Sequence, residues 1–208
     1  MAKLTESSNV KFAKILADGK LHISCDENEK GAIKREVEKT DGEKKVYIEK
    51  IYNEVEGKIT SLEIKDGDFG NVLYIGLDDE IVITVGTSSN FGTDLLKKIP
   101  NIDTSKEITV APYSFTGDKG NSIKGVTVSQ EGNKLVSFFQ DKNKKNINGL
   151  PEIDEATKPE RTAKTAWKKF WNNYFDSVEE FLVDYVTKNN TIEYVEEDTD
   201  TEDIKKEF

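Results

Sequence analysis

The sequence predicts a mainly β protein, in which a small five-stranded barrel is flanked by an N-terminal hairpin and a C-terminal helix. Two observations carry this prediction. Between residues 45 and 130, apolar and polar side chains alternate in several short runs, and this two-residue period is typical of a half-buried strand. From Ala163 to Tyr185, apolar residues instead recur at spacings of three and four, which is the period of an amphipathic helix.

The first three expected strands follow one another without a helix between them. Val46 to Ile64 is a long run with apolar residues on both parities, so it can serve two sheet faces, with a bend at Gly57. The segment from Asp66 to Asn71 is rich in turn-forming residues and leads into a cleanly alternating strand from Asn71 to Leu77. A β-branched run from Ile81 to Val85 supplies the third strand.

A short helix and two more strands complete the barrel. Ser88 or Ser89 can cap a helix whose apolar residues fall on one face and which Pro100 ends. The runs Glu107 to Phe115 and Ser122 to Gln130 then alternate as strands. Strand, strand, strand, helix, strand, strand is the element order of the oligonucleotide-binding (OB) barrel, so we expect that fold here.

The segments on either side of the barrel have patterns of their own. Val10 to Cys25 predicts a hairpin that turns at Asp18-Gly19. The highly charged residues 27–45 are expected to form a solvated excursion with a possible short strand at Ile33 to Val37. Thr157 and Glu160 fit a capping box for the long helix, which either covers the open side of the barrel or binds a partner. Four regions result: an N-terminal β extension (1–44), the OB domain (45–150), an aromatic helix region (151–190) and a disordered acidic tail (191–208).

Charge is distributed unevenly along the chain. The whole sequence has a net charge of −10 at neutral pH, but residues 191–208 combine eight carboxylates with two lysines and so account for −6. Between Lys119 and Lys145, six lysines stand against two carboxylates, a local charge of +4. The acidic average therefore conceals a basic region over the last strands, where an anionic partner can bind.

The composition argues against several classes of protein. His22 and Cys25 are the only histidine and the only cysteine, and on a strand their spacing puts them on opposite faces. We therefore expect no catalytic pair, no metal site and no intrachain disulfide. Cofactor motifs are not recognisable, so we expect no cofactor and no enzymatic activity. Apolar runs are far too short to span a membrane and the N-terminus lacks a signal sequence, which predicts a soluble cytoplasmic protein.

The acidic C-terminal segment is expected to bind another protein. It cannot bury enough apolar surface to fold, so we expect it to be disordered. It ends at Phe208, and an aromatic ring beside the terminal carboxylate can fill a small apolar pocket while the acidic residues meet basic ones. The residues expected to bind a partner are Asp198, Asp200, Glu202, Asp203 and Phe208.

These features occur together in one known group of proteins. The OB element order, the basic stretch from the fourth strand onward, the acidic terminus closing on Phe208, and the segment Asn90–Asp103 followed by Ile108–Phe115 are similar to the single-stranded DNA-binding proteins of tailed phages. The resemblance implies that the protein protects single-stranded DNA during phage replication and recombination in the host cytoplasm. It also implies that the tail recruits replication enzymes such as a polymerase or a helicase-primase, and it leaves homo-oligomerisation open.

The residues that would hold a single strand can be named. Such strands are bound without much sequence reading when bases stack on aromatic rings and lysines contact the phosphates. Tyr74 has the opposite parity to Leu73 and Ile75, so its ring is expected on the outer face of the second strand. The expected nucleic-acid-binding residues are Tyr52, Phe69, Tyr74, Tyr113, Phe115, Lys119, Lys124 and Lys134.

Two other functions fit the same pattern. An OB-fold RNA-binding protein would use the same surfaces, and the sequence offers no feature that reads the 2′-hydroxyl. A non-catalytic interaction or structural module would instead use the barrel and the aromatic helix as an interface. The interaction-module hypothesis is favoured if the lysines between residues 119 and 145 lie on unrelated faces.

Overall fold

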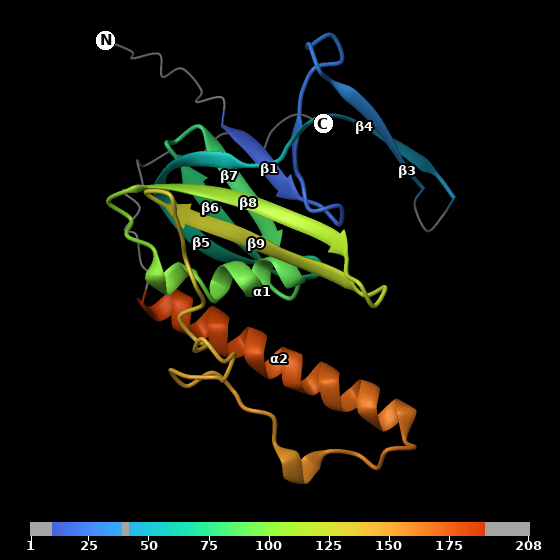
Figure 1. Cartoon of the computed structure of the whole chain (residues 1–208). Helices are drawn as coiled ribbons and strands as arrows, with labels where there is room; N and C mark the ends of the chain where they lie inside the picture. Colours follow the sequence, from blue (N-terminus) through green and yellow to red (C-terminus); the bar gives the residue numbers. More distant parts are fainter. Residues whose placement is uncertain (1–9, 39–41, 190–208) are drawn as a thin grey trace, which may run out of the picture.

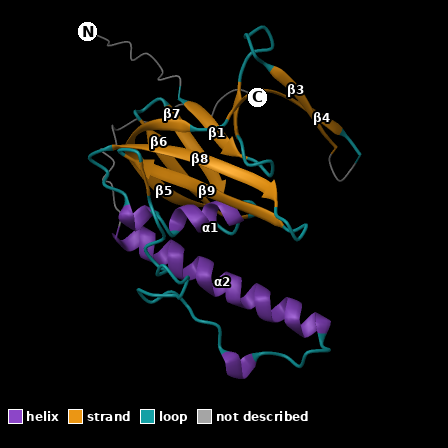
Figure 2. Cartoon of the chain, in the orientation of Figure 1, coloured by secondary structure: helices purple, strands orange, loops and turns teal. Residues whose placement is uncertain are grey.

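The computed structural model describes residues 10–38 and 42–189 of the 208-residue chain. These residues form strands, two α-helices and two short 3-10 helices (Figure 1, Figure 2). The strands are β1 Lys11–Ile15, β2 Leu21–Ser24, β3 Ile33–Glu38, β4 Lys44–Tyr52, β5 Val55–Gly67, β6 Gly70–Leu77, β7 Ile81–Gly86, β8 Glu107–Thr116, β9 Ser122–Gln130 and β10 Asn133–Lys134. The helices are α1 Asn90–Leu96, η1 Ile99–Asn101, η2 Glu155–Thr157 and α2 Lys164–Asn189.

The strands form one open sheet that folds over on itself at β5. Their order is β10-β9-β8-β5-β6-β7-β1-β2-β4-β3. The first residues of β5, Val55 to Lys58, pair with β8, whereas residues 59–67 pair with β6. As a result β8 and β9 lie across β6 and β7 as a second layer (Figure 1). The core between the layers includes Leu73, Ile75, Leu77, Val110, Val126 and Val128, all buried.

The protein is mainly β with a C-terminal helix, as expected, but the expected five-stranded barrel does not close. β5 to β9 follow one another in the expected order with α1 between β7 and β8, yet β7 and β9 do not pair. Instead, β1 pairs in parallel with the free edge of β7. The edge of β9 is satisfied by α1, because the Asp94 carboxylate accepts the Val126 N–H at 2.7 Å and the Lys98 ammonium donates to the Val126 carbonyl. Both edges therefore have hydrogen-bond partners without closure.

The long run from Val46 to Ile64 is not one strand. It divides at Asn53–Glu54 into β4 and β5, and β4 pairs with β2 and β3 instead of continuing the barrel. Within residues 27–45, the possible short strand at Ile33 to Val37 is present as β3, and it pairs with the start of β4 (Figure 1). β4 and β5 alternate with the same two-residue period, so alternation alone does not reveal the break between β4 and β5. Gly57, the expected bend, lies beside the point where β5 changes partner.

The N-terminal hairpin is present, with β1 and β2 antiparallel. Its turn contacts the second layer: a Cβ built on Gly19 would lie 2.3 Å from the backbone nitrogen of Ser114 in β8. Gly19 has a φ of +74°, so both its conformation and this close approach require glycine. The turn therefore packs against β8 near the end that carries Tyr113.

A buried charge network joins this hairpin to β3 and β4. His22 is 4% exposed, and its ring nitrogens lie 3.0 Å from the Asp18 carboxylate and 2.9 Å from the Glu49 carboxylate. Arg35 donates two hydrogen bonds to Glu49, at 2.9 and 2.8 Å. The hydrogen bonds from Arg35, followed by that from His22, lower the pKa of Glu49 against the effect of burial. Because each buried charged group has a partner, the network fixes β3 to the rest of the sheet.

The two α-helices differ in how well the sequence predicts their ends. The Ser89 hydroxyl caps α1 by accepting the Gly92 N–H at 3.0 Å, as expected. In contrast, α2 begins at Lys164, so the expected capping box at Thr157 and Glu160 is wrong. Residues 155–157 form a separate 3-10 turn, and the residue before Pro159 is held extended, as a residue before proline usually is. From Lys164 the helix then runs unbroken to Asn189.

The fully buried residues of α2 all lie in its second half, and Tyr174 of the first half packs against the core only in part. Val178 and Leu182 are buried there, and Phe139, which follows β10, is completely buried beside them. The Phe139 ring meets the Phe181 and Tyr185 rings edge to face, with centroids 5.5 and 4.9 Å away. The segment after β10, residues 135–139, therefore anchors α2 to the core. The first half of α2 extends beyond α1 and slants away from the sheet (Figure 1).

Candidate nucleic-acid interface

The β8–β9 hairpin presents two adjacent aromatic rings to solvent. Val110 and Pro112 of β8 face the core, so Tyr113 and Phe115, with the opposite parity, face outward. Tyr113 is 36% exposed and Phe115 54%. Their ring centroids are 5.9 Å apart and the rings are tilted by 33°. This pair offers two aromatic surfaces on which successive unpaired bases can stack.

A glycine on the neighbouring strand sets the position of the Tyr113 ring. Gly125 pairs with Tyr113 across the hairpin, and a Cβ built on it would lie 2.4 Å from the Tyr113 hydroxyl oxygen. The ring therefore lies directly over the backbone of β9 and reaches towards α1. Burial on this side, followed by the nearby Asp94 carboxylate, raises the pKa of the Tyr113 phenol. The phenol stays neutral at physiological pH and keeps its hydrogen-bond donor.

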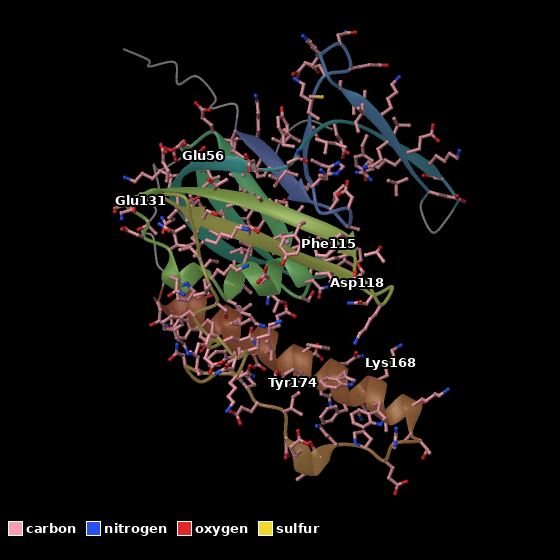
Figure 3. All side chains as sticks on the ribbon, in the orientation of Figure 1. Glu56, Phe115, Asp118, Glu131, Lys168 and Tyr174 are labelled. Carbon is pink, nitrogen blue, oxygen red and sulfur yellow. The ribbon has the colours of Figure 1, made fainter. Side chains whose placement is uncertain are left out.

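The hairpin turn places one lysine beyond the rings. The Gly117 N–H donates to the Asn121 carbonyl at 2.8 Å, and Gly120 has a φ of +74° that suits glycine. Lys119 is exposed in this tight turn and follows Asp118 in the sequence. Figure 3 labels Asp118 at the turn. In an OB barrel this turn corresponds to the loop between strands four and five, which borders the binding groove.

Lys124 does not lie beside the aromatic pair. It shares the parity of Val126, which faces the core, and its ammonium lies 6.0 Å from the centroid of the Phe91 ring in α1. Together with the ends of β1 and β7, Lys124 and Phe91 line a cavity of about 290 Å³. Lys124 therefore provides positive charge at the rim between β9 and β7, on the opposite face of the hairpin from Tyr113.

The other expected residues lie elsewhere on the molecule. Tyr74 is half-buried on the outward face of β6, as its parity predicts, with the Lys65 ammonium 5.7 Å from its ring centroid. β6 belongs to the other layer (Figure 1). Because Tyr74 and the β8–β9 rings each face away from the core between the layers, they lie on opposite outer faces. Tyr52 is 43% exposed at the end of β4, and Phe69 is fully exposed in the β5–β6 turn. Lys134 stands in β10, beyond the far end of β9 from Lys119.

The lysines of the basic window, Lys119 to Lys145, do not form one face. Lys119 is at the β8–β9 turn, and Lys124 lines the cavity beside α1. Lys134 lies past the opposite end of β9, and the remaining three, Lys142, Lys144 and Lys145, lie in the loop after Phe139. A positive charge that is concentrated in the sequence is thus spread over the surface.

The β5–β6 turn lies beside a strongly acidic part of the surface. A cavity of about 940 Å³ between this turn and α2 is lined by five carboxylates among other groups: Asp66, Asp176, Glu179, Glu180 and Asp184. The Thr87 hydroxyl donates to Glu179 and fixes this part of α2 to the end of β7. Phosphates would be repelled here. Phe69, on this turn, is therefore poorly placed for nucleic acid, and the β8–β9 hairpin is the better candidate.

Sequence reasoning missed two residues that shape the candidate interface, Asp94 and Gly125. Their roles depend on the register of β9 against β8 and on α1 covering the edge of β9, which no local pattern shows. It also missed the basic composition of residues 161–175, for which a signal exists: four cationic side chains and no carboxylate. The expected partner-binding residues, Asp198 to Phe208, lie outside the described residues.

Neither a metal centre nor a membrane segment is found in the described part of the chain. Residues 10–38 and 42–189 contain no group of three or more His, Cys, Asp or Glu side chains that could hold a metal ion. Over the same residues no helix is both long and apolar enough to cross a membrane. Comparison of the sequence with protein-family models and curated proteins, and of the fold with solved structures, finds no match.

Proposed function

We propose that this chain is a sequence-tolerant single-stranded DNA-binding protein whose primary contact is the β8–β9 hairpin. The observation that carries the proposal is the pair of exposed, adjacent rings of Tyr113 and Phe115 next to a turn that holds Lys119. Each stacked base contributes about 1–3 kcal/mol, independently of its identity. A protein of this kind would protect strands exposed during phage replication and recombination, in the host cytoplasm.

The connectivity of the central strands supports the proposal. β5, β6 and β7 form an antiparallel meander, α1 follows, and the β8–β9 hairpin returns to pair with β5. This is the strand order of an OB barrel with the contact between its third and fifth strands missing. We interpret the fold as an opened OB barrel, in which β1 and α1 take the two edges that closure would join.

The acidic tail would regulate this binding and recruit partners. Residues 191–208 have a net charge of −6 and end in Phe208. A tethered polyanion competes with DNA for basic residues when DNA is absent, and DNA binding then releases it. The freed tail would bind replication enzymes, such as a polymerase or a helicase-primase, through its carboxylates and its terminal ring.

The proposal is tested by titrating a fluorescently labelled oligo(dT) with the full chain at several salt concentrations and following anisotropy. We expect affinity to fall as salt rises, because lysines that neutralise phosphates release counterions. The Tyr113→Ala, Phe115→Ala double variant should bind at least about fivefold more weakly. Phe12→Ala is the matched control, since Phe12 is 52% exposed on β1, away from the hairpin. No binding by the wild type, or equal binding by the double variant, would contradict the proposal.

A protein-interaction module is the second candidate, and the scattered lysines favour it. If the lysines do not converge on one face, fewer of them can contact the phosphates of a polyanion that binds there. In that case oligo(dT) should leave anisotropy unchanged. Competition between DNA and RNA oligomers of the same sequence in the same assay separates the proposed function from RNA binding.

A further inference from the structure

The first half of α2 has a composition unlike the rest of the chain. Residues 161–175 contain Arg161, Lys164, Lys168 and Lys169 but no Asp or Glu, a charge of +4 in a chain of net charge −10. The same segment holds five aromatic side chains, including both tryptophans of the protein. Basic residues interleaved with aromatic rings are typical of surfaces that bind nucleic acid.

These aromatic residues continue the buried face of α2 beyond the core. In the second half of the helix, Val178, Leu182 and Val186 are buried. Seven residues make about two helical turns, so Trp171 and Phe175 lie on the line that runs through Val178 and Leu182. Towards its N-terminal end the helix slants away from the sheet (Figure 1), and Phe175 keeps 59% of its surface exposed. The described residues therefore leave this part of the face uncovered.

Lysines border the exposed rings on the same side. Lys164 and Lys168 are about one turn apart, and they precede Leu182 and Val186 by eighteen residues, or about five turns. They therefore fall on the face that the second half of α2 buries. Lys164, Lys168, Lys169 and Arg161 are all exposed. Within residues 10–38 and 42–189, none of the four has an ion pair or a side-chain hydrogen bond.

The rings are fixed in position before any ligand binds. Trp171 stacks between Trp167 and Phe175, with centroid distances of 6.2 and 6.0 Å and an interplanar angle of 26° in both cases. The Trp167 indole N–H also donates to the Glu160 carbonyl at 3.1 Å, and this hydrogen bond ties the helix to the segment that precedes it. A column of rings that is already ordered loses little conformational entropy when a ligand stacks on it.

The chemistry of this face selects one kind of partner. A single-stranded nucleic acid supplies phosphates for the four cations and free base faces for the rings. A duplex hides its base faces within the stack and offers them to the rings only at its ends. An apolar protein surface would desolvate the lysines without giving them a counter-charge, which is costly.

We propose that the first half of α2 is a second contact for single-stranded nucleic acid, formed by Trp171, Phe175, Lys164 and Lys168. In Figure 3, Lys168 lies on the same side of the molecule as Phe115 and Asp118 of the β8–β9 hairpin. The inference deepens the proposed function and rests on it, since one strand would pass from the hairpin to the helix.

Tryptophan emission reports on this contact directly, because both tryptophans, Trp167 and Trp171, lie in it. The full chain is titrated with unlabelled oligo(dT) while emission is excited at a wavelength that tyrosine does not absorb. Anisotropy of a labelled oligo(dT) is followed in parallel. We expect the tryptophan emission to be quenched, with the same midpoint as the anisotropy change. The Trp171→Ala, Phe175→Ala variant should bind at least about fivefold more weakly.

A charge variant tests the lysines separately. Lys164→Gln and Lys168→Gln are combined, since glutamine keeps a similar helix propensity. Each lost phosphate contact on a single strand reduces the slope of log K against log salt by about 0.7, so the double variant should lose about 1.4 from the slope. Its matched control replaces Lys30 and Lys34, two exposed lysines of the N-terminal region, and should keep a slope close to wild type.

Three results would overturn the inference. If anisotropy reports binding while tryptophan emission stays constant and both lysine variants behave alike, the proposed function stands and the α2 contact does not. If neither signal changes, the proposed function fails and the inference fails with it. If emission changes with protein concentration alone and DNA has no effect, the face binds a second copy of the chain.

Discussion

Replacing Asp94 by alanine is the most direct test of why the sheet stays open. The Asp94 carboxylate accepts the Val126 N–H at 2.7 Å and the Lys98 ammonium at 2.8 Å. The Lys98 side chain is only 12% exposed, so water does little to replace this partner. The variant leaves the β9 edge with an unpaired N–H and Lys98 with only the Val126 carbonyl. Loss of a charge-assisted hydrogen bond together with a poorly paired ammonium should cost about 3 kcal/mol.

The free energy of unfolding is measured by urea denaturation, followed by far-ultraviolet circular dichroism. For a chain of this size, each kcal/mol corresponds to a shift of about 2–4 °C in melting temperature. Asp94→Asn keeps an oxygen acceptor for Val126 and should lose about half as much free energy. Asp118→Ala, in the exposed β8–β9 turn, is the control and should stay within about 0.5 kcal/mol of wild type. A loss no larger than the control's would refute the idea that α1 replaces a strand at this edge.

Three further predictions follow from the same contacts. Gly125→Ala should displace the Tyr113 ring and weaken oligo(dT) binding about fivefold in the anisotropy assay; unchanged affinity would show that the ring is not used. Arg35→Gln should lower the free energy of unfolding by about 3 kcal/mol at neutral pH. Because Arg35 lowers the pKa of Glu49, the difference in free energy of unfolding between wild type and variant should narrow as the pH falls and Glu49 becomes protonated. A difference that stays constant in urea denaturations at neutral and acidic pH would contradict this prediction. Removing residues 191–208 should tighten oligo(dT) binding at low salt, and equal or weaker binding would exclude competition by the tail.

Local patterns in the sequence determined most of the secondary structure. The strands from β6 to β9, the Ser89 cap and the buried face of α1 follow from alternation, turn residues and capping, which depend on neighbours a few positions away. The outward parity of Tyr74 and of the pair Tyr113 and Phe115 follows for the same reason. The start of α2 was not predicted correctly, because the residue before Pro159 is held extended and the helix begins only at Lys164.

Only the tertiary structure decided which strand edges meet and which side chains gather. The edges of β7 and β9 could in principle pair with each other. Instead, β1 pairs with β7 and the Asp94 carboxylate accepts the Val126 N–H of β9, and both contacts join residues distant in sequence. Likewise, lysines that are neighbours in the sequence between residues 119 and 145 are separated by the length of β9. The rings of α2 become a free surface because the helix is longer than the core that it covers.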